Sequence, residues 1–159
     1  MATGTVSSIN QDNWQLIATN TTSSGTSSTF SFSGYKRLLL AWDNITSATA
    51  TYLSFSLNSS TSGYVGGGWL PGNNGYNSYS TIGVLDPFAT TGDRSGYLYI
   101  ENTASSAPKT YQGWGNDDSF PFILNGAWIN SSAVTSLQVQ FTGGQTFTGG
   151  SFSIYGIAV

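Results

Sequence analysis

Short runs in which apolar and small polar residues alternate are the feature that most constrains this chain. Phe30 and Phe32 alternate with serines, and the same period of two recurs over residues 53–57 and 137–141. A period of two places alternate side chains on opposite faces of a β-strand. No stretch carries the i, i+3, i+4 spacing of an amphipathic helix over three turns. The sequence therefore predicts an all-β protein.

The turn-forming residues between these runs predict how the strands assemble. We expect about nine strands, at residues 14–18, 28–32, 37–44, 52–58, 96–101, 110–115, 123–129, 136–142 and 151–157. Turn-forming Gly, Asn and Asp residues separate many of them. Short strands with no helix between them are typical of an antiparallel two-sheet β-sandwich, here of jelly-roll-like topology. We expect one domain over residues 13–159, preceded by an N-terminal arm over residues 1–12.

Residues 63–87 interrupt the regular pattern. This segment carries three consecutive glycines, Trp69 and several tyrosines without alternation. Because the alternation is missing, we expect a long Gly- and aromatic-rich loop or an excursion between the sheets. Loops of that length are usually functional or form interfaces.

The absence of two residue types excludes most catalytic centres. The chain contains no histidine and no cysteine. Ser-His-Asp and Cys-His nucleophile systems, and zinc sites built on imidazole or thiolate, are therefore excluded. We expect no catalytic residues, no cofactor and no metal site, and hence no enzyme.

The carboxylates are the remaining candidates for chemistry. Glycoside hydrolysis needs two carboxyl groups about 5–9.5 Å apart. Glu101 would approach Asp117 or Asp118 if the strands at 96–101 and 110–115 formed a hairpin. The simpler interpretation is that Asp43, Asp86 and Asp93 serve turns or strand ends, and that Asp117-Asp118 is a loop tip. Asn116-Asp117-Asp118 alone supplies too few oxygens for Ca²⁺, which takes six to eight.

The charge balance argues against nucleic acid and membrane partners. Only four residues are Lys or Arg, and the net charge is −3. That is too few cations to follow a phosphate backbone. The longest apolar run is far shorter than the roughly 20 residues of a membrane span. The N-terminus lacks a basic start followed by an apolar run, so we expect synthesis in the cytoplasm without a signal peptide.

Aromatic residues near the predicted loops are the candidate binding residues. They are Trp69, Tyr76, Tyr79, Tyr111 and Trp114. Aromatic side chains in such positions form subunit interfaces, pack in cores or stack on ligands. We favour an interface or core role over ligand stacking for this set. Trp14, Trp42 and Trp128 lie inside strand patterns and are expected in the core.

The scarcity of charge favours self-association. Charged residues make up 7% of the chain, and Ser, Thr, Asn and Gly supply close to half of it. Interfaces between protein subunits are depleted in charge. We therefore expect a homo-oligomer.

Three stretches of the sequence resemble a recurrent module of tailed-bacteriophage virion proteins. They are FSFSGYKRLLLA (30–41) leading to LSFSLN (53–58), GYLYIEN (96–102) followed by APKT (107–110) and GWG (113–115), and GAWINSSAVTSL (126–137) followed by FTGGSFSIYG (147–156). The closing run is the most specific of them, with Gly156 where another group comes close. The segment 63–87 departs from the family pattern.

The resemblance implies a β-sandwich on a virion surface, often a trimer, and it brings no catalytic residues. We expect a non-enzymatic bacteriophage structural protein, namely a capsid decoration or cement protein bound as a homotrimer to the head exterior. Its partners would be its own copies and the major capsid protein or other virion proteins. The alternative is a tail-tip or fibre receptor-binding module that recognises a cell-surface glycan.

Overall fold

The structure is a computed structural model that describes residues 13–69, 76–78 and 81–159, with the backbone alone described at 69 and 76–78. Strands and one short 3-10 turn make up its regular elements. They are β1 (Gln15–Thr21), β2 (Ser27–Ser31), β3 (Tyr35–Ser47), β4 (Thr51–Leu57), β5 (Tyr64–Trp69), β6 (Tyr76–Ser78), β7 (Gly83–Thr90), β8 (Arg94–Glu101), β9 (Lys109–Asn116), β10 (Pro121–Trp128), β11 (Ser136–Phe141), η1 (Thr142–Gly144) and β12 (Phe147–Ala158).

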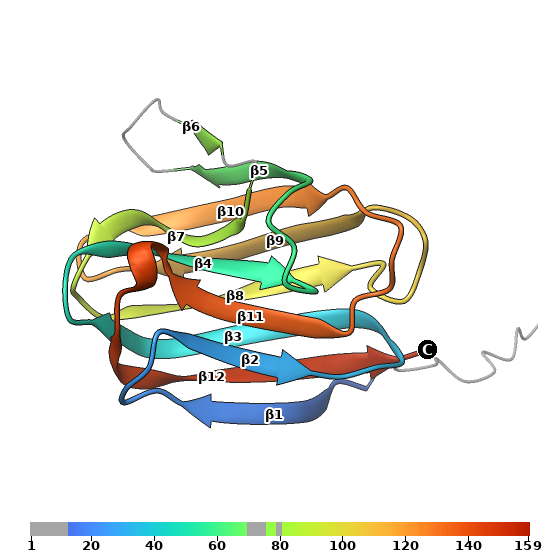
Figure 1. Ribbon diagram of the computed structural model, residues 1–159, viewed down its shortest axis with the longest axis horizontal. Coiled ribbons are helices and arrows are strands. Elements are labelled where there is room, and N and C mark those ends of the chain that lie inside the picture. The colour runs from blue at the N-terminus through green and yellow to red at the C-terminus, as the bar shows by residue number, and fades with distance from the viewer. Residues whose placement is uncertain (1–12, 70–75, 79–80) are drawn as a thin grey trace, which may run out of the picture.

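The strands form two antiparallel sheets packed face to face. The larger sheet has the order β1-β12-β3-β8-β9-β10-β5-β6, and the smaller has the order β2-β11-β4-β7. The four-stranded sheet lies in front of the larger one in Figure 1. This is the predicted two-sheet, jelly-roll-like β-sandwich. No helix in the described ranges is long and apolar enough to cross a membrane.

All nine predicted strands are present, and the structure adds three that the sequence did not reveal. The additional strands β5, β6 and β7 lie in or overlap the segment 63–87, which was predicted to be a loop. Glycine explains the error, because a residue without a side chain contributes nothing to an alternating pattern. At Gly68 a Cβ would lie 2.8 Å from the Pro87 ring, so the glycine lets β5 and β7 approach closely. The predicted arm over residues 1–12 lies outside the described residues.

Inward-facing apolar side chains of both sheets form one core. In β4, Leu53, Phe55 and Leu57 are fully buried, as the alternation predicts. Trp42 and Trp128 are buried, which confirms their predicted core positions, whereas Trp14 is 38% exposed. The prediction for Trp14 is therefore wrong. Trp14 precedes β1 and packs on the ring of Tyr99 at 5.8 Å instead of entering the core.

Candidate functional site

The carboxylate pair considered for glycoside hydrolysis does not form. β8 and β9 do pair as a hairpin, with Ser95 opposite Asn116 and Ile100 opposite Tyr111. Glu101 therefore lies at the turn end of the hairpin, and Asp117 follows Asn116 at the other end. Six residues of strand separate the two ends, or roughly 20 Å. This exceeds the carboxyl separation of either class of glycosidase, about 5–9.5 Å.

Asp86 is committed to an internal ion pair. Its carboxylate accepts a hydrogen bond from Nε of Arg94 at 2.5 Å, and both side chains are fully buried. Burial raises the pKa of the Asp86 carboxyl to about 6, although the Phe88 amide and the Arg94 guanidinium favour the ionised form. The Arg94 guanidinium also donates to the backbone carbonyls of Thr51 and Thr90. This pair joins β4, β7 and β8 and has no surface on which to meet a substrate.

Asp117 and Asp118 stabilise turns. The Asp117 carboxylate accepts hydrogen bonds from the amides of Ser119 and Phe120 at 2.8 and 2.7 Å. The Asp118 carboxylate accepts one from the amide of Asp93 at 3.0 Å. These contacts match the turn interpretation made from the sequence. Within the described ranges, no group of three or more acidic side chains is arranged to hold a metal ion.

Lys109 is a buried cation bound by backbone carbonyls. Its ammonium group donates to the carbonyl oxygens of Ser105, Ala107 and Asn130 at 2.7, 2.9 and 3.0 Å. Burial lowers the pKa of Lys109 from its ordinary value. The side chain therefore ties the loop after β8 to the loop after β10.

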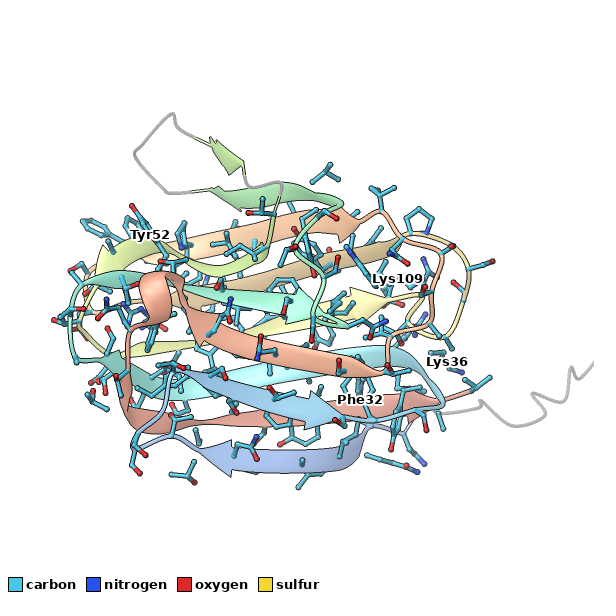
Figure 2. The ribbon with its side chains drawn as sticks, viewed as in Figure 1. Phe32, Lys36, Tyr52 and Lys109 are labelled. Atoms are coloured by element: carbon cyan, nitrogen blue, oxygen red, sulfur yellow. The ribbon has the colours of Figure 1, made fainter. Side chains whose placement is uncertain are left out.

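The exposed charges of the described residues gather at the two ends of the sandwich. Lys36, Arg37 and Glu101 lie at one end, where Arg37 pairs with Glu101 at 2.7 Å; we call this the Lys36 end. Figure 2 shows Lys36 there, with Tyr52 toward the opposite end. Asp43, Asp93 and Asp118 lie at that opposite end, which we call the Asp93 end. There the Asp43 carboxylate accepts a hydrogen bond from the Ser95 hydroxyl, and the Asp118 carboxylate accepts one from the Asp93 amide. The outward faces of both sheets between the ends carry no exposed charge among the described residues.

The outward face of the eight-stranded sheet is aromatic. Tyr97 and Trp114 are 41% and 44% exposed, and Ile123 beside them is 44% exposed. The strand register makes them neighbours, since Tyr97 pairs with Trp114 and Trp114 with Ile123. We call the outward residues Trp14, Tyr97, Tyr99, Gln112, Trp114, Ile123 and Asn125 the aromatic face.

A hollow of about 370 Å³ lies on the aromatic face, over β8, β9 and β10. One row of its lining is Tyr97, Trp114 and Ile123, and the next row is Tyr99, Gln112 and Asn125. An apolar row thus runs beside a row that carries a phenol and two amides. No charged side chain lines the hollow.

The outward face of the four-stranded sheet differs in chemistry. It presents Ser27, Thr29 and Ser31 from β2 beside Ser136, Gln138 and Gln140 from β11, paired in register. These side chains are exposed or half-buried. We call this set the hydroxyl–amide face.

The structure separates the five aromatic residues singled out from the sequence. Trp114 lies exposed in the hollow, whereas Tyr111 is 4% exposed and packs edge-on against Phe55 at 5.2 Å. Tyr111 is therefore a core residue and cannot stack on a ligand. The backbones of Trp69 and Tyr76 pair in the sheet, but their side chains, and all of Tyr79, lie outside the description.

Sequence reasoning missed Tyr97, Tyr99 and Ile123. The signal was available in residues 96–101, because two tyrosines alternate there with Leu98 and Ile100. Alternate side chains of a strand point to opposite faces of its sheet, and only one face of each sheet in a sandwich packs on the core. When both rows are large and apolar, one of them must therefore lie on the outward face. The buried row is Leu98 and Ile100, and the tyrosines face outward.

Comparisons with known proteins identify no family. No family model matches the chain, and no curated protein matches it. A solved glycosyl hydrolase family 16 protein from Mycobacterium smegmatis str. MC2 155 is similar at 13% identity, with a TM-score of 0.27. The match covers 80% of this chain and 65% of that one, less than two thirds of its length. A likeness this weak assigns neither activity nor ligand.

Proposed function

We propose that this chain is a non-enzymatic structural protein of a bacteriophage virion, a decoration protein that binds the head exterior as a homotrimer. The placement of charge supports the proposal. Both sheet faces are neutral, and the exposed charges of the described residues lie at the two ends. Bringing a neutral face against another protein removes no ion from water, and ion desolvation is a large cost of burying a surface.

The hydroxyl–amide face is the surface that we assign to the particle. Its side chains are small or carry amides, so a partner backbone approaches closely and finds donors and acceptors. Interfaces of standard size bury about 1,200–2,000 Å² and include roughly ten hydrogen bonds. Many copies on one particle add their contacts through avidity. The aromatic face then points away from the particle.

A charge placed on the hydroxyl–amide face tests the proposal. Gln138 is half-buried at the centre of this face, and Gln138→Lys would force a cation into the contact. We expect this variant to be lost from purified heads while it sediments as the unaltered protein does. Ser132→Lys adds the same charge in an exposed loop and should bind heads normally. Partition of the unaltered protein with purified tails, or equal binding by both variants, contradicts the proposal.

The aromatic face favours a second candidate function, a receptor-binding module at a tail tip or fibre. Trp114 and Tyr97 are exposed side by side on a sheet face, where an apolar patch normally marks a binding surface. Localisation with antibody on intact particles separates the two candidates. Label on heads supports decoration, and label confined to tails supports receptor binding.

A further inference from the structure

The hollow of the aromatic face has two features that together restrict its ligand. Its apolar row, Tyr97–Trp114–Ile123, crosses three adjacent strands. Neighbouring strands lie about 4.8 Å apart, so this row is about 10 Å long, enough for two linked pyranose rings. The hollow's volume of about 370 Å³ falls at the small end of ligand pockets, which range over roughly 300–1,000 Å³.

The second feature is the polar row that runs alongside. Tyr99 pairs with Gln112, and Gln112 pairs with Asn125, one step along the strands from the apolar row. An amide offers both a donor and an acceptor, which matches two neighbouring hydroxyl groups of one sugar ring. A ligand in the hollow therefore meets ring faces on one side and hydrogen-bonding groups on the other.

The two tyrosine side chains of the hollow are held in place by ring contacts. Tyr99 contacts Tyr97 edge-on at 5.4 Å and contacts Trp14 at 5.8 Å. Side chains that are already ordered lose less entropy when a ligand binds. The tyrosine side of the hollow is thus pre-formed.

We infer that the hollow over β8, β9 and β10 binds a neutral saccharide of about two rings, with Trp114 and Tyr97 stacking on its C–H faces and Gln112 hydrogen-bonding its hydroxyls. The inference rests on the receptor-binding candidate and gives it a site and a ligand class. A phosphate-bearing ligand does not fit, because the lining holds no cation. A purely apolar peptide would bury the exposed amide of Gln112 against apolar groups.

Titration calorimetry on the full chain tests this site. The probes are maltotriose, cellotriose and triacetylchitotriose as neutral saccharides, with sialyllactose as the charged comparison. We expect at least one neutral probe to bind with a Kd near 1 mM or tighter, and sialyllactose to bind more weakly. Trp114→Ala should weaken binding about tenfold and Gln112→Ala about fivefold. Trp114→Phe, which retains a ring, should keep part of the affinity.

Val65→Ala is the matched control. Val65 is 52% exposed in β5 on the same side of the sheet but does not line the hollow. This variant should bind within twofold of the unaltered protein. The inference is overturned if no neutral probe binds at about 10 mM, or if all three alanine variants weaken binding equally. It is also overturned if Trp114→Ala changes only the sedimentation of the protein, because the face is then a protein interface. Saccharide binding is measured independently of binding to heads. The calorimetry therefore tests the saccharide site even if the protein does not bind heads.

Discussion

The guanidinium of Arg94 donates to the carboxylate of Asp86 across 2.5 Å, with both side chains fully buried. Arg94 also lies 5.1 Å from the centre of the Phe141 ring. Arg94 on β8 of the larger sheet thus contacts β7 and β11 of the smaller sheet. A buried ion pair is costly to form, but removing one partner costs more, because the other charge is left in the interior.

Arg94→Met should therefore destabilise the fold strongly. We expect the free energy of unfolding to fall by about 3–5 kcal/mol, measured by urea denaturation. Arg37→Met is the matched control, because it breaks the half-exposed pair with Glu101 and should cost about 1 kcal/mol or less. The double variant Arg94→Met/Asp86→Leu should recover part of the loss. Equal costs for the two arginine variants would contradict this assignment.

Stability should depend on pH through Asp86. In the folded protein its pKa is raised to about 6 from an ordinary 3.8, so the folded state holds this proton more tightly than the unfolded state. The stabilisation is complete below about pH 4 and is lost as the pH rises through 6. We expect Asp86→Asn to remove this part of the pH dependence between pH 4 and 7, measured as urea midpoints. An identical pH profile in the variant would show that Asp86 does not titrate in this window.

Lys109→Met should weaken the contact between two loops. The substitution keeps most of the apolar stem but leaves the carbonyls of Ser105, Ala107 and Asn130 without their donor. Because these carbonyls belong to exposed or half-buried residues, losing their donor should lower the unfolding free energy by about 1 kcal/mol. Lys36→Met, at an exposed position, should change it by about 0.5 kcal/mol or less. Faster amide exchange near Asn130 in the Lys109 variant alone would locate the effect.

Asn58 should tolerate substitutions in a defined order. Its φ is +51°, and its side chain accepts from the amides of Thr135 and Ser136 and donates to the Ala133 carbonyl. Asn58→Asp keeps the acceptor, Asn58→Gly keeps only the backbone freedom, and Asn58→Ala keeps neither. Melting temperatures should fall in that order, with alanine costing about 2 kcal/mol. An alanine variant as stable as the glycine variant would contradict the backbone part of this explanation.

The fold was largely predictable because alternation survives wherever one face of a strand is buried and the other is polar. Leu137, Val139 and Phe141 show this in β11, where they are buried. The strand β7 was not predictable in the same way. It is buried along residues 83–87 and contains a charged residue and a proline, Asp86 and Pro87. Arg94, the ion-pair partner of Asp86, lies on β8, and no local pattern in the sequence indicates that Asp86 and Arg94 pair.

The candidate site was only partly predictable, because it depends on register between strands. Trp114 was singled out from its sequence, yet its neighbours Tyr97 and Ile123 lie 17 residues before and 9 residues after it. Tyr111, three residues from Trp114, has the opposite fate because an odd number of positions along a strand reverses the face. Residue type alone does not distinguish these two aromatics; the phase of the strand does.

The separation of charge between the Lys36 end and the Asp93 end makes the protein an electric dipole along its length. Near a negatively charged surface such a molecule rotates before contact, so that the Lys36 end arrives first. The torque acts mainly within a Debye length, about 10 Å at 0.1 M salt. Dilute buffer should therefore strengthen this orienting torque, even though the net charge of −3 repels the whole molecule from an anionic surface.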